Sequence, residues 1–442
     1  MDIQLSDHFT TKKLLRFTLP TIAMMVFTSI YGVVDGFFVS NFAGKTPFAA
    51  LNFILPFLMG LSAVGFMFGT GGSALVAKTL GEGDHDRANR IFSLVVFVTL
   101  GIGVCFALGG FFLIRPVAAL MGAEGELLDY CVLYGRISLC SLPLFIVQLE
   151  FQSFFVTAEK PQLGLRMTLV AGILNILLDA LFVGLFRWGL AGAAAAPAAS
   201  EITAGAFALI YFARPNSSLL RITRPRFDGR ALLQTMANGS SELLSNLSMS
   251  LVGLLYNIQL IRYAGENGVA AYGVLMYVNF LFVSIFIGFT IGTAPLISFN
   301  HGAENYAELR NLLRKSLSVI GVLSLVMLTL GQLLATPMAM IFTGYDPELL
   351  ALTTRAFTIY SFSFLFAGIA IFGSAFFTAL NNGLISAIIS FLRTLVFQSS
   401  AVFILPLIFD IDGIWLSVVV AEFAAATLSA AFIKILQKNY HY

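Results

Sequence analysis

Long runs of apolar residues, separated by short polar segments, follow one another along the whole chain. A transmembrane helix needs about 20 predominantly apolar residues. The runs of at least that length predict twelve membrane-spanning helices, over residues 14–41, 47–79, 88–115, 130–157, 163–186, 190–213, 231–263, 268–299, 312–335, 350–379, 384–409 and 414–436. None of the segments between these runs is long and polar enough to form a separate soluble domain.

Composition supports an all-α integral membrane protein and excludes several other classes. Hydrophobic residues make up 58% of the 442 residues and charged residues only 11%, against about 25% charged in soluble domains. A net charge of +2 leaves no basic excess for nucleic acid. The chain has no G-x-x-x-x-G-K-[ST], H-E-x-x-H or G-x-S-x-G motif. We therefore expect neither an enzyme nor a cofactor-dependent protein, and no nucleic-acid partner.

Basic residues are distributed unequally between the two sides that the twelve spans define. With an even number of spans, both termini lie on one side, and most of the 25 Lys and Arg residues fall there too. The other side keeps only Lys45, Arg115, Arg136, Arg187, Arg262 and Arg355. Positive charge marks the cytoplasmic side of membrane proteins. The pattern predicts a multi-pass protein of the cell (plasma) membrane with both termini in the cytoplasm.

An internal repeat divides the chain into two halves around a polar connector. The connector, residues 214–230, carries five arginines and separates two sets of six spans. A shift of 221 residues superposes Gly71 on Gly292, Gly81 on Gly302, Gly192 on Gly413 and Glu201 on Glu422. Because six is even, the halves share one orientation and are related by a pseudo-two-fold axis along the membrane normal. We predict an N-lobe over 1–213 and a C-lobe over 231–442, an architecture typical of transporters.

Six carboxylates fall inside apolar runs, where charge is expensive, and are candidates for function. They are Asp35, Glu150, Asp179, Glu201, Glu242 and Glu422. The shared repeat position of Glu201 and Glu422 favours a common architectural role. Asp35 maps to Tyr256 and Asp179 to Ala401, so this acidic pair occurs only in the N-lobe. A coupling site in one lobe fits this asymmetry better than a symmetric channel does.

Helix geometry places Asp35 and Asp179 at similar depth. Asp35 follows Pro20 by about 22 Å of helix, and Asp179 lies about 24 Å into the fifth span, which runs in the same direction. Asn175 lies one turn before Asp179 on the same helix face. Two carboxylates and a carboxamide can bind a hard cation such as Na⁺. They can equally carry a proton, because burial and a like-charged neighbour favour the neutral form of a carboxyl group.

These features together resemble the MATE (multidrug and toxic compound extrusion) family over nearly the whole chain. The resemblance rests on the two six-span lobes, on Pro20 with Asp35, on the segment from Ala77 to Asp84 with its counterpart from Ser298 to Asn305, and on Asn175-x-x-x-Asp179. It implies efflux of organic, often cationic, compounds against inward H⁺ or Na⁺. Asp35, Asn175 and Asp179 then match the family's cation site and would be the metal ligands if Na⁺ is coupled.

Other assignments follow from this resemblance or remain as alternatives to it. Glu150, Glu201 and Glu242 are secondary acidic candidates, with Glu242 placed for substrate. Pro197 stands where family members often carry a Thr, which removes one cation ligand. We expect small organic cations and the lipid bilayer as partners, and a functional monomer. A lipid-linked oligosaccharide flippase, favoured only by the intramembrane Arg393, and a passive channel are the alternatives.

Overall fold

The computed structural model describes residues 3–38, 45–344 and 346–442, and within these ranges all regular structure is helical. The helices are α1 Thr11–Phe38, α2 Lys45–Gly81, α3 His85–Leu120, α4 Gly125–Thr157, α5 Pro161–Asp179, α6 Gly189–Ala213, α7 Gly229–Gly302, α8 Tyr306–Thr343, α9 Pro347–Tyr360, α10 Phe364–Ala379, α11 Gly383–Phe391, α12 Gln398–Ile404 and α13 Pro406–Tyr440. Two π-helical turns, Ala180–Leu185 and Leu392–Phe397, and one 3₁₀ turn, Ser361–Ser363, interrupt them.

The twelve predicted passes are confirmed, although two of them form one continuous element. Helix α7 has 74 residues, which would be about 110 Å of straight helix and far more than one bilayer needs. It breaks at Gly265, where φ is 60° and ψ is −148°, a conformation that glycine adopts at low cost. The predicted spans 231–263 and 268–299 are its two arms. Residues 39–41 of the first predicted span lie outside the described residues.

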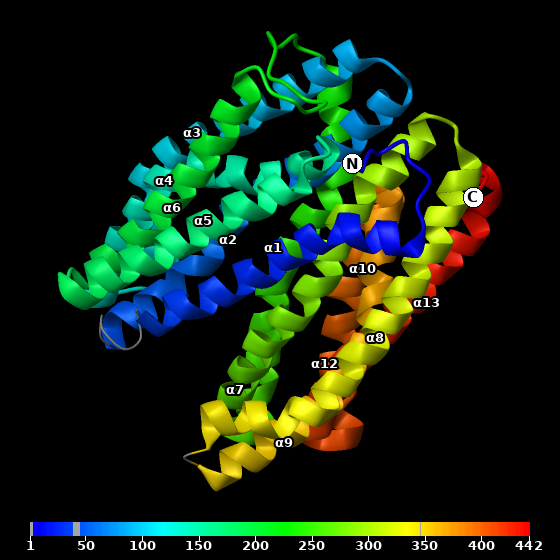
Figure 1. Ribbon diagram of the computed structural model, residues 1–442. Helices are drawn as coiled ribbons and strands as arrows, with labels where there is room; N and C mark the ends of the chain where they lie inside the picture. The colour runs from blue at the N-terminus through cyan, green and yellow to red at the C-terminus, as the bar shows by residue number, and fades with distance from the viewer. Residues whose placement is uncertain (1–2, 39–44, 345) are drawn as a thin grey trace.

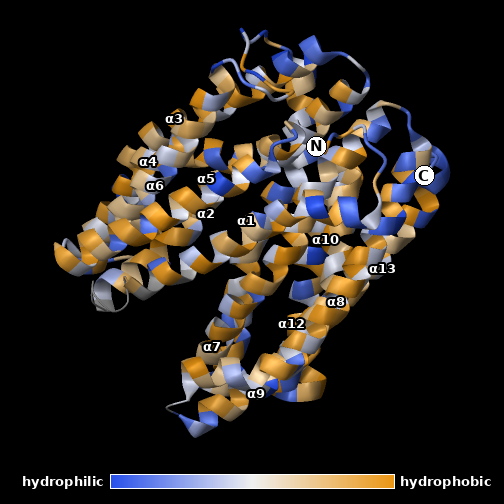
Figure 2. Ribbon diagram, in the orientation of Figure 1, coloured by the Kyte–Doolittle hydropathy of each residue, from blue (hydrophilic) through white to orange (hydrophobic). Residues whose placement is uncertain are grey.

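The helices form two bundles that meet at one end and diverge at the other, with α1–α6 in one bundle and α7–α13 in the second (Figure 1). Both termini and the connector between Ala213 and Gly229 lie at the end where the bundles meet. Hydrophobic residues make up most of the length of the helices, whereas hydrophilic residues concentrate near the helix ends (Figure 2). The residue limits of the lobes as separate domains, 1–213 and 231–442, stay a prediction.

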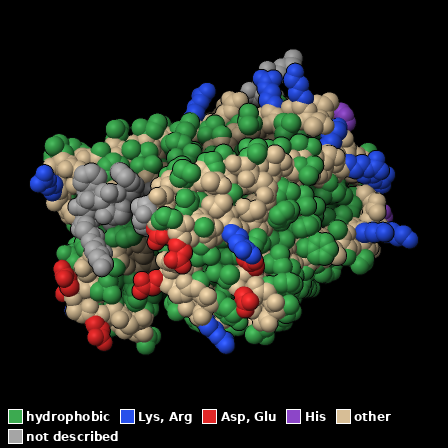
Figure 3. Space-filling view, turned by 90° about the horizontal axis from the view of Figure 1, so that it is seen from below, with side chains coloured by type: hydrophobic (Ala, Val, Ile, Leu, Met, Phe, Trp, Pro, Cys, Tyr) green, Lys and Arg blue, Asp and Glu red, His purple; other side chains and the backbone are tan. Residues whose placement is uncertain are grey.

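The outer surface is suited to lipid. Seen from below, apolar side chains cover much of the molecule, while most Asp and Glu side chains in this view gather at the lower left and most Lys and Arg lie at the upper and right edges (Figure 3). Phe112 and Ile341 are 76% and 75% exposed. Many such exposed apolar side chains together suit a surface that faces an apolar medium.

Close backbone contacts between α2 and α7 hold the bundles together at the end where they meet. A Cβ atom added to Gly81 would collide with the carbonyl of Phe299, and one added to Gly302 would collide with the carbonyl of Lys78. Lys78 and Phe299 are themselves related by the 221-residue shift. The contact is therefore reciprocal about the pseudo-two-fold axis, and small residues are needed because they let the two backbones approach.

The N-terminal segment adds a second link between the bundles. The backbone N–H of Leu5 donates to Glu159 Oε1 in the α4–α5 loop over 2.6 Å, and that of Phe9 donates to Glu308 Oε1 on α8 over 2.9 Å. Asn311 on α8 also donates to the Phe9 carbonyl oxygen over 3.0 Å. Residues 3–10 thus bridge both bundles on the side of the connector.

We call the close α2–α7 contact the seam. A substitution in the seam tests whether the close approach of the two backbones contributes to stability. A Cβ at Gly239 would collide with the Met67 carbonyl, whereas one at Gly253, on the same helix, meets nothing within 4 Å. We expect Gly239→Ala to destabilise the protein by about 1–3 kcal/mol through overpacking. The measurement is the fraction of detergent-solubilised protein that survives heating, read by size-exclusion chromatography. Equal heat survival of Gly239→Ala and the control Gly253→Ala would contradict a close-packed seam.

Candidate functional site

Helices α1 and α5 pack side by side and bring Asp35 and Asp179 together. Gly172 permits this approach, because a Cβ there would collide with the Phe27 ring and lie 3.0 Å from the Tyr31 ring of α1. The two carboxyl groups are close enough for their charges to interact. The structure therefore joins the pair whose similar depth the sequence indicated.

Polar atoms at this site are buried and lack partners. Asn175 and Asp179 are 1% and 0% exposed. Both carboxylate oxygens of Asp179, both amide atoms of Asn175 and Oδ1 of Asp35 have no hydrogen-bond partner among the described residues. Buried polar groups in folded proteins are nearly always satisfied, and exceptions call for a water, an ion or a functional role. A proton or a cation bound here would supply the missing interactions.

A π-helical turn begins directly after Asp179. The backbone N–H of Phe186 bonds to the carbonyl of Leu181 over 2.8 Å, an i to i−5 contact. The turn forms the end of the helical segment, since residues 186–188 are not helical. Sequence reasoning missed this turn, because one added residue in a uniformly apolar run leaves no mark on the hydrophobic pattern.

Glu201 on α6 belongs to the same acidic cluster. Its Oε2 accepts a 2.6 Å hydrogen bond from Ser141 Oγ on α4, and its charge interacts with that of Asp35. Tyr31 and Tyr134 both lie close enough to Asp35 and Glu201 to interact electrostatically with them. Sequence analysis did not single out the tyrosines, since nothing in the linear pattern relates α1 and α4 to α6. They extend the cluster to four helices of one bundle.

Helix α6 continues through Pro197, four residues before Glu201 in the chain. Proline has no N–H to donate within a helix. The Pro197 carbonyl accepts a 2.8 Å hydrogen bond from Ser200 Oγ. The ring offers no oxygen ligand at this position, as the sequence indicated, but the helix is not broken there.

Glu150 lies in a different environment, on α4 beside Thr99 of α3. Its side chain is fully buried, and neither carboxylate oxygen has a hydrogen-bond partner in the described part of the chain. The backbone of α2 passes very close, since a Cβ on Gly69 would lie 3.0 Å from the Glu150 Cα. Glu150 is thus a second buried acid within the same bundle.

The second bundle carries a neutralised charge pair instead of free acids. Arg393 Nε donates to both carboxylate oxygens of Glu422, over 3.1 and 2.9 Å, and Glu242 interacts with the same guanidinium. Glu201 and Glu422 therefore have different partners, Ser141 and Arg393, and the common role suggested by the repeat finds no support. Tyr256, at the repeat position of Asp35, bonds to Ser417 over 2.7 Å.

The donors at the α1–α5 site are those that a hard cation prefers. Carboxylate and amide oxygens from Asp35, Asn175 and Asp179 match oxygen-ligand chemistry. Among the described residues there is no group of three His, Cys, Asp or Glu side chains placed to hold a metal ion. A cation here would therefore need the amide of Asn175 and further oxygens besides the two acids, whereas a proton needs only one carboxylate.

Relatives of known name match the chain over almost its full length. The multidrug export protein MepA of Staphylococcus haemolyticus is 26% identical over 429 residues, which cover 97% of this chain and 94% of that protein. MepA of Staphylococcus saprophyticus is 24% identical over 427 residues, covering 96% and 94%. A crystal structure of MATE in complex with MaL6 has a TM-score of 0.93 at 22% identity and covers 98% of both chains. That likeness supports the fold.

A family model matches both halves of the chain. The model named MatE fits the chain twice, over residues 20–181 and 243–404. The two matches begin 223 residues apart, at 20 and at 243, close to the shift of 221 that relates the halves. Asp35, Asn175 and Asp179 all lie within the first match. Because the two matches together span most of a multi-pass helical membrane protein, the chain belongs to the MatE family.

Proposed function

We propose that this protein is a multidrug efflux antiporter that exports organic cations in exchange for H⁺ or Na⁺. The observation that carries the proposal is the pair Asp35 and Asp179: Oδ1 of Asp35 and both carboxylate oxygens of Asp179 lack hydrogen-bond partners among the described residues, as do both amide atoms of Asn175. An acid pair of this kind binds a proton or a cation more readily than it remains doubly charged in a membrane interior. The relatives named as multidrug export proteins support the export of multiple drugs.

The arrangement of the bundles supports alternating access. The seam between α2 and α7 and the N-terminal bridge close the side of the connector, while the bundles diverge on the other side (Figure 1). A solved relative with a TM-score of 0.93 is described as an outward-facing multidrug resistance transporter. We propose the same outward-facing state for this structure. We also propose that the connector and both termini lie in the cytoplasm, and that the protein acts as a monomer in the plasma membrane.

The acid pair can couple ion entry to this conformational change. In the outward-facing state, an ion from outside binds at Asp35 and Asp179 and removes the repulsion between them. Helices α1 and α5, which carry the two acids and touch at Gly172, can then pack differently. A ligand shifts a conformational equilibrium only by its difference in affinity for the two states. The ion is released to the cytoplasm when the seam opens, and the protein then returns to the outward-facing state.

The charge of the substrate completes the exchange. An organic cation entering between the bundles is attracted by the N-lobe acids, and ion binding at the same acids weakens that attraction. Competition of this kind gives antiport rather than symport. The flippase alternative has no support from the second bundle, because Arg393, the residue that favoured it, is already paired with Glu422.

The proposed topology predicts which loops are accessible from outside cells. In a background without Cys105, Cys131 and Cys140, Ser217→Cys in the connector should resist a membrane-impermeant maleimide until cells are permeabilised. Glu124→Cys, in the α3–α4 loop, should react in intact cells, and both positions are exposed. Labelling is read by mass shift on a gel. Reaction of Ser217→Cys in intact cells would reverse the proposed orientation.

The coupling assignment predicts the effect of neutralising each acid. Asp35→Asn and Asp179→Asn keep side-chain shape, but they cannot take up a proton and they remove the negative charge that would hold Na⁺. Each should slow gradient-driven efflux by about tenfold or more, since coupling free energies are typically about 1–3 kcal/mol. Efflux of ethidium is measured from vesicles holding purified protein, under a pH gradient and a Na⁺ gradient applied separately. The gradient that drives wild-type efflux identifies the coupling ion.

Two variants serve as controls for this experiment. Asp129→Asn removes an exposed N-lobe carboxylate that is paired with Arg115, and Tyr256→Phe changes the repeat position of Asp35. Both should transport at close to the wild-type rate. If Asp35→Asn and Asp179→Asn also transport at that rate, the coupling site must instead be sought at Glu150, Glu201 or Glu242.

A further inference from the structure

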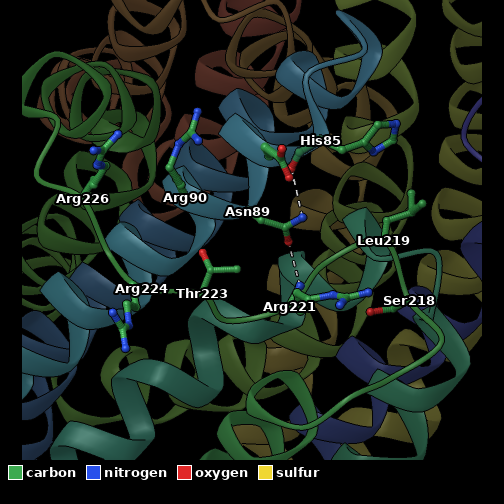
Figure 4. Close-up of a pocket in the computed structure, with 10 residues that line it drawn as sticks. His85, Asn89, Arg90, Ser218, Leu219, Arg221, Thr223, Arg224 and Arg226 are labelled. Carbon is green, nitrogen blue, oxygen red and sulfur yellow. Dashed lines mark hydrogen bonds between the residues drawn. The ribbon is translucent and has the colours of Figure 1, made fainter.

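The connector forms a basic pocket against the start of α3, outside the acidic cluster. The cavity has a volume of about 820 Å³ and is open to the surface. Arg90 projects from α3, and Arg221, Arg224 and Arg226 come from the connector (Figure 4). Nothing in the proposed transport cycle uses these residues.

Hydrogen bonds fix the wall of this pocket. Asn89 Oδ1 on α3 accepts from the backbone N–H of Arg221 over 2.8 Å, a bond drawn in Figure 4. One further turn along α3, Ser93 Oγ accepts from the backbone N–H of Thr223 over 2.8 Å. The connector is thus held along α3 at two points, which fixes where the connector backbone that carries the arginines lies relative to Arg90.

The pocket has a large excess of positive charge. Among the described residues, no carboxylate lies within salt-bridge distance of Arg90, Arg221, Arg224 or Arg226. Asp86 is the single acid among the lining residues. Guanidinium groups bind phosphate through paired, charge-assisted hydrogen bonds. Four unpaired arginines around one acid therefore suit a phosphate group better than a neutral or cationic ligand.

An apolar groove adjoins the basic pocket on α6. This second cavity, of about 410 Å³, is lined by Phe207, Ile210 and Tyr211 together with connector residues 214–217. Ser217 lines the groove and Ser218 the basic pocket, so the two cavities meet at neighbouring residues. Phe207 and Ile210 are 44% and 51% exposed on a membrane-spanning helix. The basic pocket and the apolar groove are therefore lined by adjacent residues of the connector, near the end of α6.

We propose that this pair of cavities binds an anionic phospholipid, with the head-group phosphate between Arg90 and the connector arginines and an acyl chain along α6. Basic pockets at the ends of spanning helices are typical sites for anionic lipid head groups. The groove selects a lipid over a free phosphate, because only a lipid also buries the exposed apolar side chains. The lipid would tie the connector, which joins the two bundles, to α3.

Native mass spectrometry of the detergent-purified full chain tests the site. The probes are phosphatidylglycerol, phosphatidylcholine and glycerol phosphate, each titrated separately. We expect wild-type protein to retain phosphatidylglycerol. The triple variant R221Q/R224Q/R226Q should bind it at least about tenfold more weakly, since each Arg→Gln substitution removes a charge-assisted contact with the phosphate. The matched control R314Q/K434Q/K438Q removes three exposed charges from the other bundle and should bind as wild type does.

The other outcomes each overturn part of the proposal. Equal retention of phosphatidylglycerol by both triple variants would show that the pocket is not the site. Equal binding of phosphatidylcholine would remove the role of the arginines in selecting anionic lipid, and binding of glycerol phosphate as tightly as phosphatidylglycerol would remove the role of the groove. The assay requires neither transport nor an orientation in the membrane, so its failure is independent of the proposed antiport.

Discussion

The hydrocarbon interior of the membrane is the constraint on which the rest of this structure depends. It offers no water to a backbone N–H or C=O, so each pass must satisfy these groups within its own helix. It also makes every charged side chain costly. The exceptions are therefore informative. In the second bundle, Arg393 and Glu422 neutralise each other, whereas in the first Asp35 and Asp179 oppose each other with no basic partner among the described residues.

This difference in charged residues makes the two bundles chemically unequal, although their architecture is nearly symmetric. The seam is reciprocal, with Gly81 against Phe299 and Gly302 against Lys78, as expected of two halves related by a pseudo-two-fold axis. The chemistry is confined to one half. Tyr256 takes the repeat position of Asp35 and bonds to Ser417 within its own bundle. In the proposed cycle, symmetric packing supplies two bodies that can move against each other, and the asymmetric acids couple that movement to ion binding.

The seam and the acid site differ in how well their atoms are packed and paired. The seam is densely packed, whereas several polar atoms of the acid site lack hydrogen-bond partners among the described residues. Backbones that touch through glycine pack in few alternative ways, because interiors are as dense as crystals, and so the seam favours discrete open and closed states. The acid site is the opposite case: α5 ends at Asp179 and continues as a π-turn, and buried oxygens there lack partners. The π-turn on α5 lies directly beside the acid pair. A proton or cation bound to these acids can therefore change the packing of α5 more than a ligand bound to a regular, well-packed helix would.

The sequence by itself determined the passes, their pairing into halves and the position of the acids along their helices. Hydrophobic length, charge bias and a constant repeat shift are local or periodic properties, and the membrane converts them directly into helices of fixed length and direction. Asp35 and Asp179 could be matched in depth for the same reason. Only the tertiary structure decided that α1 and α5 touch at Gly172, that Glu201, Tyr31 and Tyr134 surround Asp35, and that Arg393 belongs to Glu422. Which faces of two apolar helices meet depends on side-chain packing among many alternatives of similar energy, and in a chain that is apolar on nearly every face the hydrophobic pattern cannot choose between them.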